Sequence, residues 1–182
     1  KNNYINGELI IVDDNSPDGT AETASSFSNK YNIKVLKRKG KLGLSSAVLD
    51  GFSMARGDIL GVMDADFSHP VEKIPEMLAA MKGYDFVIGS RLVKGGGVEN
   101  WPMKRRIISA GARLLARGLT DIKDTQSGFF LIKRSVLEQA RGLNPRGFKI
   151  CLELLVKGKY SKAKEVPITF KDRVYGESKL GK

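Results

Sequence analysis

The stretch DILGVMDAD, residues 58–66, places two carboxylates directly after a run of apolar residues. The apolar run has the length of a buried strand, and glycine and proline bound it at Gly57 and Pro70. Open α/β sheets bind their ligands beyond the carboxyl ends of their strands. Asp64 and Asp66 are costly to bury together without a cation, and their oxygens suit Mg²⁺ or Mn²⁺. The stretch therefore predicts a metal site at a sheet edge, although an isolated Asp-x-Asp can also be a solvated turn.

Strand-like and helix-like segments alternate on both sides of this stretch. Strand patterns occupy residues 8–14, 33–37, 58–63, 84–88, 127–133 and 163–171. Helical patterns occupy residues 20–30, 42–55, 71–81, 103–119, 134–140 and 148–157. Alternation with short connections is typical of a mostly parallel sheet with helices on its faces. The predicted fold class is therefore α/β, in a single domain over residues 1–182.

The composition is that of a globular protein with a large basic excess. The chain has 182 residues, of which 41% are hydrophobic and 28% charged, and its formal net charge is +11. Such a charge favours an acidic partner: nucleic acid, an anionic membrane surface or a phosphorylated small molecule. No stretch reaches the roughly 20 apolar residues of a transmembrane helix. The single cysteine, Cys151, is predicted to be a core residue on a helix.

A glycine-rich segment and a basic helix follow the predicted strand at 84–88. Residues 89–102 form a long predicted loop, and long loops in compact domains are often functional or mobile. The helix predicted at 103–119 has one apolar side and one basic side. A helix of this kind packs on a core or lies on a lipid surface, and the pattern leaves both alternatives open.

Seven strings in the chain carry a resemblance to a known family. In chain order they are IIVDDNSPDGT, GLSSAV, GVMDADFSHP, IGSRLVKGGGVENWP, DTQSGFF, GFKI and RVYGESKL. With these strings the chain resembles the dolichol-phosphate mannose synthases, which are polyprenyl-phosphate sugar transferases. Those enzymes belong to the family-2 glycosyltransferases of GT-A (Rossmann-like) fold. The resemblance extends over nearly the whole chain.

The resemblance implies a donor site built from several segments. Ile11 and Asp13 are expected to contact the nucleotide base. The metal ligands are expected to be Asp64, Asp66 and Ser68, and the sugar nucleotide is expected to contact Asp64, Ala65 and Asp66. A terminal loop is expected to close over the nucleotide phosphates with Arg173, Ser178 and Lys179. Asp14 is left with two interpretations, a cap of the following helix or turn and a ligand contact.

The resemblance also implies an acceptor site. Arg91, Arg105 and Ser109 are expected to receive the phosphate of the acceptor lipid. An arginine offers a bidentate fork to phosphate, and Ser109 lies four residues after Arg105, so both can share one helix face. Asp124 is expected to face the acceptor. The expected catalytic residues are Asp66, Arg91, Arg105 and Asp124.

The function hypothesis is metal-dependent, inverting transfer of mannose from GDP-mannose to a polyprenyl phosphate such as dolichyl phosphate. The expected cofactor is Mg²⁺ or Mn²⁺, and the expected location is the cytoplasmic face of a membrane, peripheral or anchored by segments outside this chain. An acceptor phosphate is already ionised, so no base is needed, and His69 is expected to be structural. A UDP-glucose or other UDP-sugar donor stays open, as does a degenerate transferase fold without turnover. A nucleic-acid-binding module is disfavoured, because few aromatic residues are interleaved with the basic ones.

Two departures from the family pattern lead to further expectations. The family begins with a strand that ends in a Pro-x-Tyr-Asn-Glu-like segment, and no part of this sequence matches it. We expect the chain to be a partial record of a longer polypeptide, incomplete at its N-terminus and lacking the first family strand. The link between Leu119 and Asp121 is also short beside the family pattern, which can reflect an omitted loop.

Overall fold

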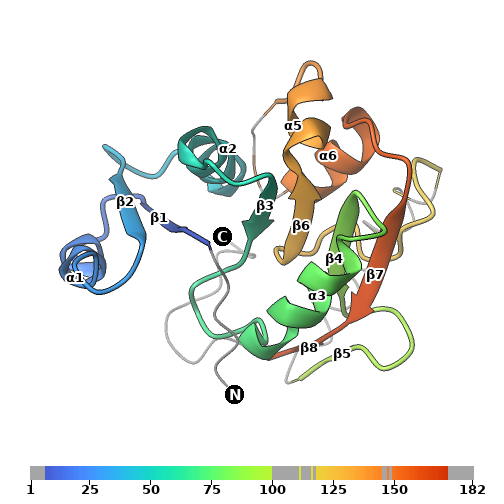
Figure 1. The fold of residues 1–182 in the computed structure, drawn as a ribbon, viewed down its shortest axis with the longest axis horizontal. Coiled ribbons are helices and arrows are strands. Elements are labelled where there is room, and N and C mark those ends of the chain that lie inside the picture. The colour runs from blue at the N-terminus through green and yellow to red at the C-terminus, as the bar shows by residue number, and fades with distance from the viewer. Residues whose placement is uncertain are drawn as a thin grey trace. The chain divides into compact units, whose positions relative to one another are not determined.

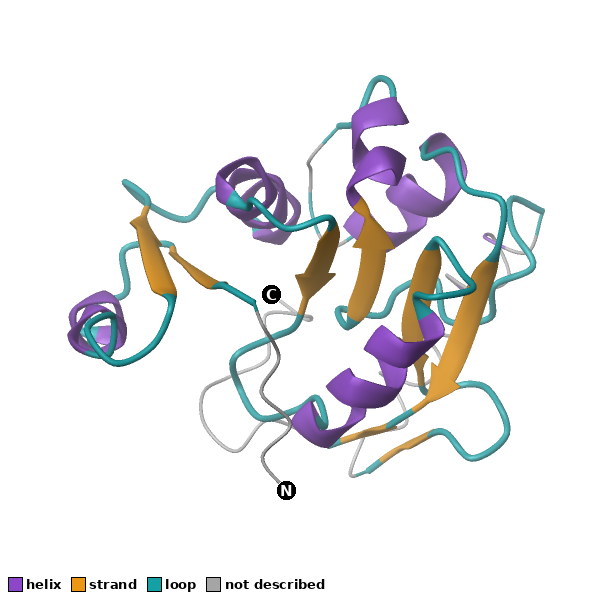
Figure 2. Ribbon diagram, in the orientation of Figure 1, coloured by secondary structure: helices purple, strands orange, loops and turns teal. Residues whose placement is uncertain are grey.

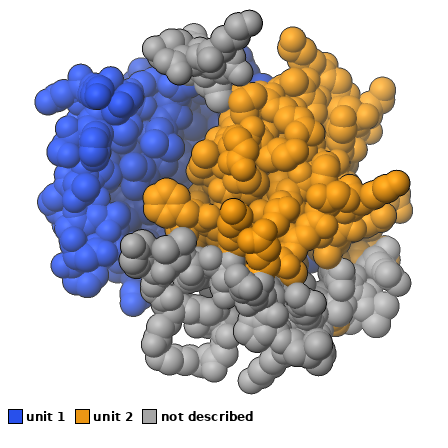
Figure 3. Space-filling model, turned by 90° about the horizontal axis from the view of Figure 1, so that it is seen from below, with its two compact units in different colours: residues 1–60, 133–159 blue, residues 61–132, 160–182 orange. Residues whose placement is uncertain are grey.

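The computed structural model describes residues 7–99, 111, 116, 118–144, 147 and 149–171. The chain divides into two compact units, coloured separately in Figure 3. The first unit contains residues 1–60 and 133–159, and the second contains residues 61–132 and 160–182. The assignment of residues 1–182 to a single catalytic domain stays a prediction.

The first unit contains a pair of parallel strands, β1 (Leu9–Asp13) and β2 (Ile33–Lys37). Its helices are α1 (Thr20–Ser26), α2 (Leu44–Met54), α5 (Arg134–Gln139) and α6 (Ile150–Lys157). Gly51 lets α2 approach β1 closely, because an added Cβ would lie 3.1 Å from a methyl group of Val12. Cys151 is buried on α6, as predicted.

The second unit is organised around β4 (Phe86–Ser90), as Figures 1 and 2 show. On one side β4 pairs antiparallel with β6 (Phe130–Lys133), and on the other it pairs parallel with β7 (Ala163–Pro167). With β3 (Ile59–Val62) the strand order is β3-β6-β4-β7. A second pair, β5 (Gly97–Val98) and β8 (Thr169–Phe170), is parallel.

A helix covers one face of this sheet. A 3₁₀ turn at Val71–Lys73 leads into α3 (Ile74–Ala80), which runs alongside β4 and β7 in Figure 1. A buried cluster joins the helix to the strands through Met77, Met81, Val87, Phe129, Leu131, Val166 and Ile168. Burial of apolar side chains on this scale is the main term that stabilises such a layer. Among the described residues, no helix combines the length and the apolar character needed to cross a membrane.

The observed elements confirm the α/β prediction and correct several of its boundaries. Helix α1 ends four residues before the predicted end, and the hydroxyls of Ser25, Ser26 and Ser28 donate to backbone carbonyls nearby. Such local bonds compete with helix continuation. The strand predicted at 163–171 is divided into β7 and β8.

Strand β4 extends two residues further than predicted, into the glycine-rich segment. Gly89 reads as a strand breaker in the sequence. In the structure an added Cβ at this position would lie 2.8 Å from a ring carbon of Phe129 and 3.2 Å from a methyl carbon of Ile168. Glycine is therefore required by close packing within the strand rather than by a turn. The rest of the predicted loop includes β5, so the described part of 89–102 is more regular than expected.

Candidate active site

The two aspartates lie where the sequence placed them, directly after β3. The Asp64 side chain is 35% exposed, and Asp66 is half-buried. The Oδ1 atom of Asp66 accepts a hydrogen bond of 3.1 Å from the backbone N–H of Ser68. Between Asp66 and Ser68, Phe67 has a left-handed φ of 61°, a backbone conformation that few non-glycine residues adopt. The loop backbone thus positions the Asp66 carboxylate.

A buried histidine supports the same loop. His69 Nδ1 accepts a hydrogen bond of 3.3 Å from the backbone N–H of Asp64. The His69 ring packs against Phe129 and Phe170, with ring centroids 5.3 and 5.1 Å away. Burial lowers the pKa of His69 to about 4, and the nearby Arg91 guanidinium acts in the same direction. The imidazole is therefore neutral at pH 7, which is the state that can accept the Asp64 N–H.

A glycine gives the Asp64 carboxylate its space. A Cβ added at Gly128 would lie 3.2 Å from Oδ2 and 3.4 Å from Oδ1 of Asp64. The same Cβ would lie 3.4 Å from Cε1 of His69. A side chain at Gly128, within the DTQSGFF string, would therefore crowd the Asp64 carboxylate.

Gly128→Ala is expected to weaken Mn²⁺ binding about tenfold, because the Asp64 carboxylate would have to move a few tenths of an ångström. Mn²⁺ titration calorimetry with nucleoside diphosphate present measures the effect. Gly83→Ala is the matched control, since a Cβ there meets nothing within 4 Å. Unchanged Mn²⁺ affinity in Gly128→Ala would contradict the expectation that Asp64 must keep this position to bind the ion.

A third oxygen near the loop lacks a partner in the described part of the chain. Ser68 is 1% exposed, and its Oγ has no hydrogen-bond partner among the described residues. A buried hydroxyl without a partner costs roughly 1–3 kcal/mol, which a ligand can offset. Two carboxylates and a hydroxyl fit Mg²⁺ or Mn²⁺ by their chemistry. No group of three His, Cys, Asp or Glu gathers within the described ranges, so an ion here would also need substrate oxygens.

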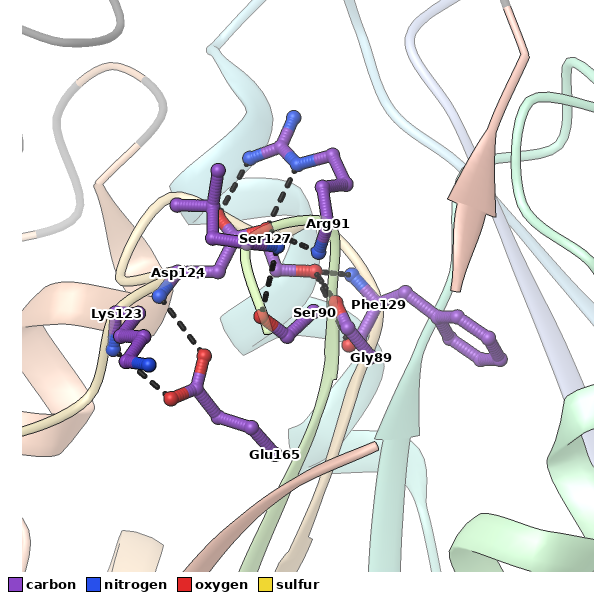
Figure 4. Close-up of polar contacts among 9 residues, drawn as sticks. Gly89, Ser90, Arg91, Lys123, Asp124, Ser127, Phe129 and Glu165 are labelled. Atoms are coloured by element: carbon purple, nitrogen blue, oxygen red, sulfur yellow. Dashed lines mark hydrogen bonds and ion pairs between the residues drawn. The ribbon is translucent and has the colours of Figure 1, made fainter. Parts of the chain in front are cut away.

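Figure 4 shows how Arg91 and Asp124, both predicted site residues, lie against each other. Asp124 Oδ2 accepts from the backbone N and the Nε of Arg91, at 2.9 and 2.8 Å. Asp124 Oδ1 accepts from Nη2 at 2.6 Å. Asp124 is 1% exposed and the Arg91 side chain is also largely buried. The pair is therefore a bidentate, buried ion pair at the end of β4.

The predicted base-binding residues belong to the first unit. Ile11 is half-buried in β1, and Asp13 is buried with its Oδ2 accepting from the Ser16 N–H at 3.0 Å. Asp14 accepts a 2.6 Å hydrogen bond from Nε of Arg38. Asp14 thus pairs with Arg38, and its expected ligand contact stays a prediction.

The buried Arg38 is a residue that the sequence did not single out. Its Nη1 also donates to Asp50 at 3.0 Å and to Ser46 at 2.8 Å. Arg38 follows β2 directly, whereas its partners lie just after β1 and on α2. Their convergence leaves no signal in the local pattern.

Several predicted site residues lie outside the described residues, namely Arg105, Ser109, Arg173, Ser178 and Lys179. Ala65 is described and is exposed in the loop between the two aspartates. Most of the helix predicted at 103–119 is also outside the described ranges, although Gly111 and Ala116 are helical.

Comparisons with known proteins bear on this arrangement. The family model of glycosyl transferase family 2 matches residues 1–141. A dolichol-phosphate mannosyltransferase of Pyrococcus furiosus is 54% identical over 97% of this chain and 51% of its own length. One from Mycosarcoma maydis is 49% identical over 96% of this chain and 62% of its own length. The chain thus spans about half to two thirds of these relatives.

A solved structure shares the fold at low sequence identity. Glucosyl-3-phosphoglycerate synthase from Mycobacterium tuberculosis was solved with Mn²⁺, uridine-diphosphate-glucose and phosphoglyceric acid. It superposes with a TM-score of 0.62 at 18% identity, over 95% of this chain and 62% of that one. This likeness confirms the predicted GT-A fold. The match of the family model over residues 1–141 shows that the chain belongs to glycosyl transferase family 2.

Proposed function

We propose that this chain carries the catalytic part of an enzyme that transfers mannose from GDP-mannose to a polyprenyl phosphate such as dolichyl phosphate. The names of the relatives support this acceptor and this sugar. The observation that carries the proposal is the loop after β3, where two carboxylates and the buried Ser68 hydroxyl offer oxygens at the end of a strand. This donor set suits a divalent ion shared with a diphosphate.

The described side chains support a metal site for the sugar-nucleotide donor. Asp64, Asp66 and Ser68 would hold Mg²⁺ or Mn²⁺. When bound, the ion would stabilise negative charge on the departing diphosphate. A solved structure of the same fold contains Mn²⁺ with a sugar nucleotide, which supports such an ion here.

Arg91 supports the acceptor half of the proposal. Its guanidinium is fixed by Asp124, and a fixed guanidinium suits a phosphate because it loses little freedom on binding. The phosphate oxygen would attack the anomeric carbon as the bond to the diphosphate breaks, which inverts the configuration. The phosphate is already largely ionised at pH 7, since its second pKa is about 6. No protein base is needed.

We also propose that the protein acts at the cytoplasmic face of a membrane. A polyprenyl acceptor resides in a bilayer, and a chain with a net charge of +11 is attracted to an anionic leaflet. The basic residues of the sequence between 103 and 119 would add to this attraction.

Parallel assays with GDP-mannose and UDP-glucose test the proposal. Each radiolabelled donor is supplied with a short polyprenyl phosphate in detergent, with Mn²⁺ or with excess EDTA. We expect labelled lipid from GDP-mannose only, and none in EDTA. Preference for UDP-glucose would show that the donor is not GDP-mannose. Transfer that continues in EDTA would show that the reaction needs no metal ion. No transfer from either donor would favour a fold that binds nucleotide without turnover.

A further inference from the structure

Glu165, which the sequence did not single out, makes two hydrogen bonds that bear on the acceptor side of the site (Figure 4). Its Oε2 accepts from the backbone N–H of Lys123 at 3.0 Å. Its Oε1 accepts from the backbone N–H of Asp124 at 3.0 Å. Both oxygens of one carboxylate are thus bound to consecutive amides.

Glu165 is well placed to hold this segment still. It lies in β7, where it is the register partner of Ile88 in β4. Residues 118–129 contain no helix or strand, so the amides of Lys123 and Asp124 have no ladder to pair with. The Glu165 carboxylate therefore provides the acceptors that a neighbouring strand would otherwise provide. A charged acceptor also makes stronger hydrogen bonds than a neutral one.

The segment held by Glu165 carries the carboxylate that orients Arg91. Asp124 accepts three hydrogen bonds from Arg91, and two of them come from the guanidinium. Since the pair is buried, its geometry depends on where the Asp124 backbone lies. The neighbouring Ser127 hydroxyl, which donates to the Gly89 carbonyl at 2.7 Å, attaches the same segment to β4.

We infer that Glu165 and Asp124 are positioning residues for Arg91: Glu165 fixes the backbone of Asp124, and Asp124 fixes the guanidinium that receives the acceptor phosphate. The inference rests on the proposed function for the role of Arg91. It gives Asp124 a role through Arg91 rather than on the acceptor itself.

Glu165→Gln is a sharp test, because a carboxylate offers two acceptors and an amide offers one acceptor and one donor. One of the two backbone N–H groups must then face an N–H₂ group. We expect KM for polyprenyl phosphate to rise about tenfold, the factor expected for one hydrogen bond lost. KM for the nucleotide sugar should change less than twofold. Glu138→Gln is the matched control, since it makes the same change at an exposed position on α5.

A readout independent of turnover accompanies the kinetics. The Nε–H resonance of Arg91, identified by its loss in Arg91→Lys, reports the contact with Asp124 in the whole protein. We expect this resonance to shift or broaden in Glu165→Gln and to stay unchanged in Glu138→Gln. Amide exchange of Lys123 and Asp124 in the wild type should be slow, which tests the contacts even if Glu165→Gln does not fold.

The outcomes separate the inference from the proposed function. An unchanged Arg91 resonance and acceptor KM in Glu165→Gln would overturn the inference, as would fast exchange of both wild-type amides. Equal rises in both KM values would also overturn it, because they would indicate a general structural effect. If the wild type transfers no sugar, the proposed function fails, and the resonance and amide exchange still decide whether Glu165 positions Arg91.

Discussion

Asp66→Asn is expected to lower the rate of sugar transfer about a thousandfold and to leave the fold intact. The asparagine oxygen can still accept the Ser68 N–H, so the loop keeps its conformation. What is lost is one negative charge next to the expected ion. If that charge supplies about 4 kcal/mol to the stabilisation of the departing diphosphate, the rate falls by about three orders of magnitude.

The measurement is kcat/KM for mannosyl transfer at saturating Mn²⁺, with circular dichroism to verify folding. Asp58→Asn serves as the control, because Asp58 is exposed at the opposite end of the same predicted strand. Transfer within about threefold of the wild-type rate, a difference below 1 kcal/mol, would show that Asp66 holds no metal during catalysis.

Asp124→Asn is expected to lower the free energy of unfolding by about 3–5 kcal/mol, because it removes one charge of a buried pair. Asp124 is 1% exposed and the Arg91 side chain 10%, so water cannot solvate the positive charge that remains on Arg91. Urea denaturation followed by circular dichroism measures the change. The double variant Arg91→Met/Asp124→Leu should be more stable than Asp124→Asn, since it leaves no buried charge from the pair. A loss below about 1 kcal/mol, typical of an exposed pair, would contradict the buried geometry.

The position of the loop that carries Asp64 and Asp66 was predictable because its signal is local. An apolar run followed by Asp64 and Asp66 identifies the end of a strand without any knowledge of its neighbours, and the structure ends β3 at Val62. The direction of β6 was not predicted. A helix predicted at 103–119 between the strands at 84–88 and 127–133 favours a parallel crossover, but β6 pairs antiparallel with β4.

The contacts that orient the site were not predictable, because they join residues far apart in the sequence. Arg91 and Asp124 were each singled out, but they are separated by 33 positions and the sequence does not show that they pair. Glu165 lies between Lys164 and Val166 in an ordinary strand pattern, and its two amide partners lie about forty residues earlier. Which residues meet in these contacts depends on how the strands pair in the folded sheet.

The segment from Asp124 to Gly128 reaches both participants in the proposed reaction. At one end, Asp124 binds the Arg91 guanidinium, which is expected to hold the acceptor phosphate. At the other end, Gly128 lies against the Asp64 carboxylate, which is expected to lie beside the sugar nucleotide. A displacement of this short span would carry both supports together. The distance between the attacking oxygen and the anomeric carbon would then change little when the surrounding chain moves.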